Sequence, residues 1–219
     1  MVQTASHQDY PPVLSDLLSR NQSWAESQKK ENPALLEACA KGQSPKVLWI
    51  GCADSRVPES VACQAQPGEI FVTRNIANQF NPDDDNAISV LTYAVQALGV
   101  EHVVVVGHTS CGGVNAAIAG SEIPIPEVPA STALFRHLTP LTKLAFDVKK
   151  ENPGLEGAEL AAKVTEASVK RQMKNIIETD VIKGNWSGEV SPLSNKVMNK
   201  VTVHGWIYDI ATGQIQVVS

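Results

Sequence analysis

Four consecutive valines, Val103–Val106, constrain the fold of this chain more than any other feature. β-branched side chains favour extended backbone, so this run predicts a central β-strand. A second apolar run, Lys46–Cys52 (KVLWIGC), lies between Pro45 and a loop and is typical of a strand buried on both faces. A third strand is predicted over Glu69–Thr73 (EIFVT), after the turn signal Pro67-Gly68.

Segments with helical periodicity alternate with these strands. In Asp84–Leu98 the apolar residues recur at the spacing of one helix face. Further helices are predicted over Gly112–Ala119, about Ser131–Lys150 and Leu155–Thr179. The last stretch, residues 201–218, alternates and turns at Thr212-Gly213, which is typical of a terminal strand pair. This order predicts an α/β fold, with a central, mainly parallel β-sheet and flanking helices.

Residues 1–45 differ from the rest and are predicted to form an N-terminal helical arm. Leu14, Leu17 and Leu18 stand at helical spacing, and Pro33 begins a second short helix. Such an arm has little core of its own. We expect it to embrace a neighbouring subunit, although packing on its own domain is the alternative. Residues 46–219 are predicted to form one catalytic α/β domain.

Composition narrows the classes of partner. The chain has 219 residues, the length of one α/β domain with a full core. Its formal net charge is −5 and no run of Lys and Arg offsets it, which argues against a nucleic-acid partner. Since no apolar stretch approaches the roughly 20 residues of a bilayer span, no membrane partner is expected.

The N-terminal segment and the cysteines bear on location. No basic region is followed by an apolar one, so a secretory signal is not expected. Asp9 and Asp16, with no Arg before Arg20, argue against a mitochondrial presequence, and a cytoplasmic location is predicted. Four cysteines are too few for a disulfide scaffold and indicate metal binding or catalysis instead.

Two short segments concentrate the reactive side chains, Gly51–Glu59 (GCADSRVPE) and Gly107–Gly113 (GHTSCGG). Each follows a predicted buried strand, at the end where open α/β sheets bind ligands. His108 and Cys111 are three residues apart, and Cys52 can join them if the two strands are neighbours. Two thiolates and one imidazole suit Zn²⁺ and leave its fourth position for catalysis. The alternative is that each cysteine is simply a small buried residue.

An acidic and a basic residue follow Cys52 at two and four positions. Asp54 can accept a hydrogen bond from metal-bound water, or bind the metal itself. Arg56 has the forked guanidinium that holds a carboxylate through two hydrogen bonds. The partner that Asp54 takes would decide whether the fourth metal position is open. An ordinary ion pair in a loop is the alternative reading.

Together these motifs match a known family. GCADSRVPE and GHTSCGGV, with FVTRNIAN and HGWIYDI, resemble the β-class carbonic anhydrases of fungi, plants and bacteria, from about Trp24 to the C-terminus. The resemblance implies one zinc per chain on Cys52, His108 and Cys111, and a catalytic dyad of Asp54 and Arg56. It also implies reversible hydration of CO2 to bicarbonate and a proton, through zinc-bound hydroxide.

The same resemblance implies a substrate pocket and an assembly. Gln43, Phe71, Tyr93 and Gly112 would bind the substrate, with part of the pocket supplied by the partner subunit of a homodimer. The dimers are expected to pair into a tetramer. Taken alone, Phe71 and Tyr93 would be interpreted as core residues, and Gln43 as a polar surface residue.

A regulatory hypothesis concerns four other residues. Trp49, Val57, Arg74 and Tyr208 match positions that hold a non-catalytic bicarbonate in bacterial-type members of the family. There, Asp54 would leave its arginine and bind zinc, with activity falling at lower pH. The alternative is that Trp49 and Tyr208 are core aromatics and that Arg74 forms an ion pair.

Three rival functions remain at this level. A thiol enzyme would use Cys52 without metal, but phosphatase loops place Arg six residues after the cysteine, and Arg56 is four after. A structural zinc module would need a fourth permanent ligand. A CS2 hydrolase could use the same site. Cys39 and Cys63 are predicted to be buried structural thiols.

Overall fold

A computed structural model describes residues 10–122 and 132–219 of the chain. The chain divides into two compact units, the first ending at Gln43 and the second spanning Ser44–Ser219. The predicted arm, residues 1–45, extends two residues beyond this division. Each unit is described by itself.

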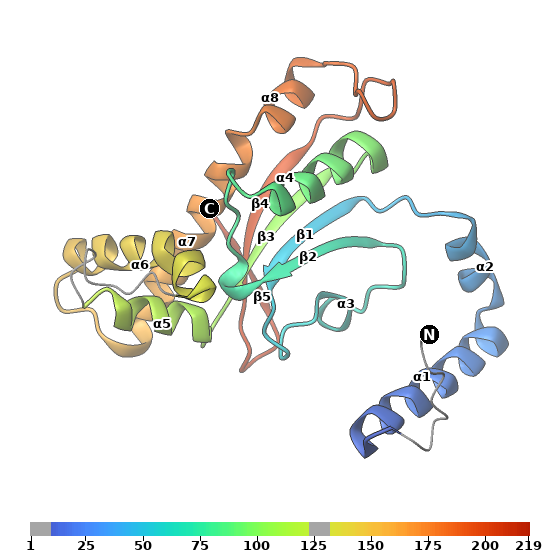
Figure 1. Cartoon of the computed structure of the whole chain (residues 1–219), viewed down its shortest axis with the longest axis horizontal. Coiled ribbons are helices and arrows are strands. Elements are labelled where there is room, and N and C mark those ends of the chain that lie inside the picture. The colour runs from blue at the N-terminus through green and yellow to red at the C-terminus, as the bar shows by residue number, and fades with distance from the viewer. Residues whose placement is uncertain (1–9, 123–131) are drawn as a thin grey trace. The chain divides into compact units, whose positions relative to one another are not determined.

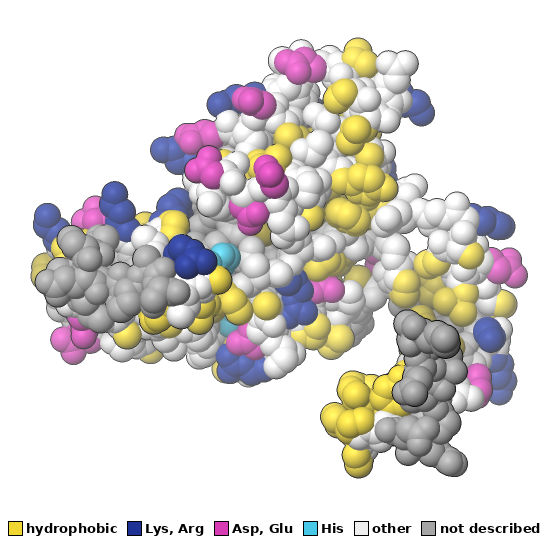
Figure 2. Space-filling model, in the orientation of Figure 1, with side chains coloured by type: hydrophobic (Ala, Val, Ile, Leu, Met, Phe, Trp, Pro, Cys, Tyr) yellow, Lys and Arg dark blue, Asp and Glu magenta, His cyan; other side chains and the backbone are white. Residues whose placement is uncertain are grey.

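The first unit consists of two helices, α1 (Pro12–Glu31) and α2 (Pro33–Lys41). A proline begins each helix, where its missing N–H costs nothing. Neither helix contains a buried residue. The exposed apolar side chains include Leu14, Leu17 and Trp24, and Figure 2 shows hydrophobic side chains gathered on this unit. These side chains therefore lack the cover that a core would provide.

The second unit is built on a five-stranded sheet in the order β2-β1-β3-β4-β5 (Figure 1). The strands are β1 (Val47–Cys52), β2 (Ile70–Asn75), β3 (His102–His108), β4 (Thr202–Tyr208) and β5 (Ile215–Val218). The pairs β1–β2, β1–β3 and β3–β4 are parallel, and β4–β5 is antiparallel. The predicted mainly parallel sheet and the terminal strand pair are confirmed.

Helices follow the strands as the α/β pattern predicts. They are α3 (Glu59–Ala62), α4 (Asp85–Thr92), α5 (Gly112–Gly120), α6 (Ala133–Glu151), α7 (Gly157–Ile177) and α8 (Asp180–Ser187). The predicted helix 84–98 continues beyond α4 as a π-helical stretch, Tyr93–Leu98, and ends at Gly99 in the left-handed region, φ 72°. A short 3-10 turn, Ile76–Asn78, follows β2.

The valine run explains how the sheet is covered. Val103 and Val105 pack on one face, where the buried residues include Leu91 of α4, Val169 of α7 and Ile182 of α8. Val104 and Val106 lie on the other face with Trp49. Every valine of the run is at most 4% exposed. Because the side chains of a strand alternate between its faces, a run with no polar member requires cover on both.

Candidate metal centre

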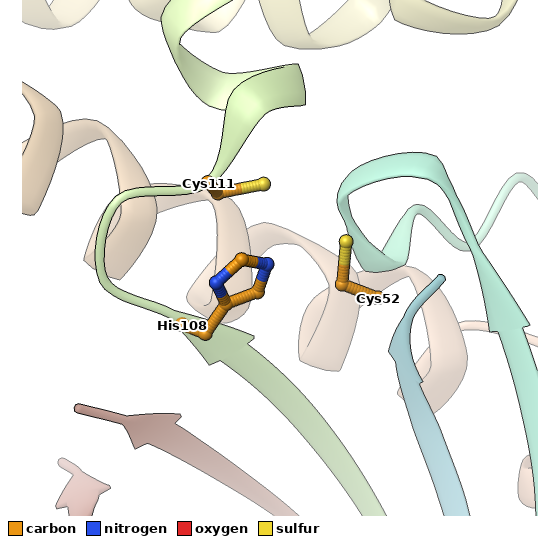
Figure 3. A group of neighbouring side chains, drawn as sticks. All are labelled: Cys52, His108 and Cys111. Atoms are coloured by element: carbon orange, nitrogen blue, oxygen red, sulfur yellow. The ribbon is translucent and has the colours of Figure 1, made fainter. Parts of the chain in front are cut away.

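The two reactive segments meet at the carboxyl ends of neighbouring strands. Strands β1 and β3 pair directly, so Cys52, the last residue of β1, lies near His108, the last residue of β3. Cys111 stands immediately before α5. Their ligand atoms all lie within 4.8 Å of one another (Figure 3). The three residues are 5%, 1% and 3% exposed, so the predicted cluster forms inside the protein.

The orientation of His108 fits this cluster to a cation. Its Nδ1 lies 2.9 Å from the carbonyl oxygen of Thr109. Since a carbonyl only accepts, Nδ1 carries the ring proton and Nε2 keeps its lone pair. Nε2 is buried and has no hydrogen-bond partner among the described residues. A buried nitrogen without a partner is costly, and a metal ion held with the two sulfurs would satisfy it.

The thiol nearest the imidazole is prepared as a thiolate. The pKa of Cys52 is lowered to about 4, first by the hydrogen bond from Cys111, against the opposing effect of burial, and then by His108. The backbone N–H groups of Asp54 and Ala77 add to this effect. The pKa of Cys111 is raised, because its proton is shared with Cys52 and because it is buried. One ligand is thus anionic before any cation binds.

Cys111 gains a different kind of support from its position. It directly precedes α5, where the backbone N–H groups of Gly113 and Val114 point toward its sulfur and lower its pKa against the larger raising effects. The positive end of the helix dipole also favours a thiolate at this place. The second sulfur is therefore placed so that a cation can displace its proton.

Asp54 and Arg56 form the predicted pair beside the cluster. Arg56 donates from Nε to Oδ1 of Asp54 at 3.0 Å and from Nη2 to Oδ2 at 2.7 Å. Arg56 Nη2 also donates to the carbonyl oxygen of Ser110 at 3.1 Å. These hydrogen bonds hold the pKa of Asp54 well below its usual range. Asp54 Oδ2 lies 3.9 Å from His108 Nε2, so an ionised carboxylate faces the metal cluster.

The segment after β2 supports the site in a way that the sequence did not reveal. Ala77 adopts the left-handed region, φ 60°, and its N–H donates to Cys52. A Cβ on Gly113 would lie 2.9 Å from the Cβ of Ala77, so only glycine lets α5 approach this segment. The motif FVTRNIAN contains Ala77, but the conformation of this residue depends on packing and leaves no mark in the residue type.

Arg74 braces the loop that carries Asp54. Its Nε donates to the carbonyl oxygen of Cys52 at 2.7 Å, and Nη2 donates to the carbonyl oxygen of Asp54. Its Nη1 lies 3.9 Å from Glu59 Oε2. Arg74 therefore uses two of its N–H groups to hold backbone carbonyl groups of the site. This contact was also absent from the sequence-based predictions.

The four residues of the regulatory hypothesis are only partly gathered. Trp49 and Arg74 lie near each other. Arg74 pairs in register with Gly51, and the indole of Trp49 lies over this glycine. Trp49 is buried and meets Trp206 edge to face. Tyr208 stands on β4, three strand spacings or about 14 Å from the strand of Arg74. Val57 is buried.

Two of the predicted substrate residues, Phe71 and Tyr93, lie away from the metal ligands of the same chain. Phe71 and Tyr93 contact each other, with ring centroids 5.8 Å apart. Phe71 pairs with Leu48, four residues or about 13 Å before Cys52 along β1. Gly112 begins α5, and a Cβ built there meets nothing within 4 Å. Gln43 is exposed and belongs to the first unit.

The predicted burial of the two remaining cysteines is wrong. Cys39 and Cys63 are both exposed. Cys39 lies in α2, which has no buried residue, and Cys63 directly follows the four-residue α3. Neither position has a core against which a thiol could pack.

Comparisons with known proteins agree with this geometry. Residues 47–215 match the family model described as carbonic anhydrase. A carbonic anhydrase of Emericella nidulans is 33% identical over 91% of this chain and 81% of its own length. The crystal structure of a β-carbonic anhydrase of Aspergillus fumigatus is 34% identical, covers 94% of this chain and 90% of its own, and has a TM-score of 0.79.

A tetrameric β-carbonic anhydrase of Sordaria macrospora is 30% identical and superposes with a TM-score of 0.81, covering 95% of this chain and 98% of its own. Among the described residues, no helix has both the length and the apolar character needed to cross a membrane.

Proposed function

This chain belongs to the β-class carbonic anhydrases, enzymes that hydrate CO2 reversibly, and from that premise we propose that Cys52, His108 and Cys111 hold one zinc ion per chain. One observation carries the proposal. His108 Nε2 is buried without a hydrogen-bond partner among the described residues, within 4.8 Å of two cysteine sulfurs. Two cysteine sulfurs and one histidine nitrogen are ligands typical of zinc sites.

Bound zinc supplies a Lewis acid that makes water acidic enough to act as a nucleophile near neutral pH. The protein supplies the orientation. Because Arg56 keeps Asp54 ionised, the carboxylate can only accept hydrogen bonds, and Oδ2 is the oxygen directed at the cluster. A nucleophile that donates its hydrogen to Oδ2 would turn its lone pair away from Asp54, toward a CO2 molecule. Asp54 thus acts by orientation and Arg56 by holding Asp54.

We propose that the substrate pocket is completed by a second subunit. Phe71 lies about 13 Å along the sheet from Cys52 of its own chain, and Tyr93 packs against it, which suits residues that serve a neighbouring site. Gln43 and Gly112 stay proposals for the same pocket. An oligomer is supported by the tetrameric relative of Sordaria macrospora. A homodimer that pairs into a tetramer is the form we propose.

The regulatory switch stays a prediction, in which Asp54 leaves Arg56 and binds zinc while Trp49, Val57, Arg74 and Tyr208 hold bicarbonate. In its favour, Asp54 Oδ2 lies 3.9 Å from His108 Nε2. Against it, Arg74 donates to two backbone carbonyls and faces the carboxylate of Glu59.

A pair of zinc-bound crystal structures, at acid and alkaline pH, tests this switch. Movement of Asp54 onto zinc at acid pH supports it. An Asp54–Arg56 pair that is intact in both crystals refutes it.

Stopped-flow CO2 hydration tests the proposed function. We expect Asp54→Asn to retain one zinc per chain and to lose about 10²- to 10³-fold in kcat/KM, because the amide cannot accept as the carboxylate does. Asp83→Asn, which makes the same charge change at an exposed position, should change kcat/KM less than twofold. Zinc-loaded wild-type protein that does not hydrate CO2 would refute the proposal.

A further inference from the structure

A polar cavity lies apart from the metal centre, between α6, α7 and residues 79–84. Its volume is about 280 Å³. The polar side chains that line it include Gln79, Asp84, Arg136, His137, Arg171 and Asn175. None of the metal ligands and neither member of the Asp54–Arg56 pair lines it. A cavity of this size, below the 300–1,000 Å³ of pockets for drug-sized ligands, suits a small ion with its waters.

Arg171 is the central charge of this cavity. It donates from Nη1 to the carbonyl oxygen of Pro140 and from Nη2 to Oε1 of Gln79 at 3.0 Å. Both acceptors are neutral. Among the described residues no carboxylate lies within 4 Å of this guanidinium. Burial lowers the pKa of Arg171, as expected for a charge that has lost water without gaining a counter-ion.

A network of buried amides fixes the arginine in place. Gln79 Oε1 also accepts from Gln172 Nε2 at 3.2 Å, and Gln172 Oε1 accepts from the N–H of Phe80 at 2.9 Å. Gln79 and Gln172 are 7% and 1% exposed. A guanidinium has five N–H groups, and the two hydrogen bonds that Arg171 donates leave three N–H groups for a ligand. The cavity therefore presents donors that are already oriented.

The charges that face the cavity limit the charge of its ligand. Arg136 and Arg171 are the arginines that line the cavity, and Asp84 is the carboxylate that lines it. Asp84 Oδ1 is turned toward α4, where it accepts from the N–H of Asn86 at 2.9 Å. His137 Nε2 donates to the carbonyl oxygen of Ile76 at 2.9 Å. Asp84 is thus engaged by α4, and the single charge of Arg171 matches a ligand with one negative charge.

We propose that this cavity is a binding site for a small monovalent oxyanion of the carboxylate or bicarbonate class, held by the guanidinium of Arg171. A carboxylate matches a guanidinium through paired hydrogen bonds, and a half-buried arginine with no carboxylate partner among the described residues gains from such a ligand. The site stands on its own contacts and does not rest on zinc or on CO2 chemistry.

The cavity is also linked to the metal centre through two hydrogen bonds. Gln79, which accepts from Arg171, donates from Nε2 to the carbonyl oxygen of Ala77 at 2.6 Å. The N–H of Ala77 donates to Cys52. An anion on Arg171 would therefore bind two hydrogen-bonded residues away from a metal ligand.

Calorimetric titration with sodium acetate tests the site in the zinc-loaded full chain. We expect wild-type protein to bind acetate and Arg171→Met to lose about tenfold or more of the affinity at this site. Lys170→Met is the matched control, because it removes the same charge from the next residue of α7, where Lys170 pairs with Glu166 on the surface. Its affinity should stay within twofold of wild type. A crystal soaked in acetate should show the carboxylate on Arg171.

Three outcomes would overturn the proposal. These are equal acetate affinity in wild type and Arg171→Met, an equal loss in Lys170→Met, and a soaked wild-type crystal whose cavity holds no acetate. If Arg171→Met does not fold, Arg171→Lys replaces it. Lysine keeps the charge without the fork, so affinity should fall about threefold or more, and an unchanged affinity refutes the site.

Discussion

Two regions of the molecule differ in how well their key side chains are buried. The metal-ligand cluster at the carboxyl ends of β1 and β3 is buried, whereas the apolar side chains of the two-helix arm are exposed. At the strand ends, three ligand atoms lie within 4.8 Å of one another and are buried. In α1, Leu14 and Leu17 remain exposed, and the helix has no buried residue. The candidate ligand cluster is thus formed by residues of one chain, whereas an exposed apolar face of this kind marks an interaction surface. We propose that the apolar face of the arm serves assembly.

The largest expected effect comes from removing one of the buried metal ligands. Cys52→Ser removes one of two sulfur ligands, so we expect zinc to fall well below one per chain and CO2 hydration to fall by about 10³-fold or more. Metal analysis and stopped-flow assays measure both. Cys63→Ser, at an exposed cysteine outside the cluster, is the matched control and should change neither. Full activity of metal-free Cys52→Ser protein would contradict the assignment.

The next variant acts on the arm alone. Leu17→Glu places a charge on its apolar face, so we expect subunit association to weaken by about 30- to 100-fold while zinc stays at one per chain. Sedimentation velocity over a concentration series measures the change. Ser19→Glu carries the same charge on another side of the helix and should associate as wild type does. Equal behaviour of the two variants would separate the arm from assembly.

The number of protons released on zinc binding tests the assigned metal ligands. Zinc binds two thiolates and a neutral imidazole. The pKa of Cys52 is lowered and that of Cys111 is raised, because the two sulfurs share one proton, and zinc must displace it. The pKa of His108 is also raised, against the lowering effect of burial, chiefly through Cys52. Zinc binding should therefore release between about one and two protons, and affinity should fall as pH falls.

Calorimetry of zinc binding to the metal-free chain, in buffers of different ionisation enthalpy, counts these protons. Binding without proton release, or binding that tightens on acidification, would contradict the assigned ligand set.

The smallest expected effect concerns packing at the end of β1. A Cβ on Gly51 would overlap the indole of Trp49, so Gly51→Ala should lower the free energy of unfolding by about 1–3 kcal/mol. Gly112→Ala is the matched control, since a Cβ there meets nothing within 4 Å. Thermal unfolding of the zinc-loaded proteins compares the two. An equal loss in both variants would show that the indole does not restrict this position.

Much of the fold could be predicted because its central strands are short, largely apolar runs in the sequence. The valine run can only be a covered strand, and the predicted strand Lys46–Cys52 agrees with the observed Val47–Cys52 within one residue. Helix α8 was missed because DVIKGNWS contains a glycine and polar residues of low helix propensity. Packing supplies what propensity lacks, since Ile182 is fully buried.

The site also has parts that could be predicted from the sequence and parts that could not. The ligand cluster could be predicted because each motif is short and follows a strand, so strand order alone brings the motifs together. The contacts of Arg74 and the conformation of Ala77 could not, because they depend on segments that meet only after folding. The cavity around Arg171 combines α6, α7 and residues 79–84, and no local pattern joins these segments.

X-ray absorption at the zinc K-edge of the zinc-loaded full chain tests the central claim most directly. If Cys52, His108 and Cys111 hold the ion, its first shell contains two sulfurs at about 2.3 Å and one imidazole nitrogen at about 2.0–2.1 Å, with one further light ligand. A first shell with fewer than two sulfurs, or without an imidazole, would contradict the account.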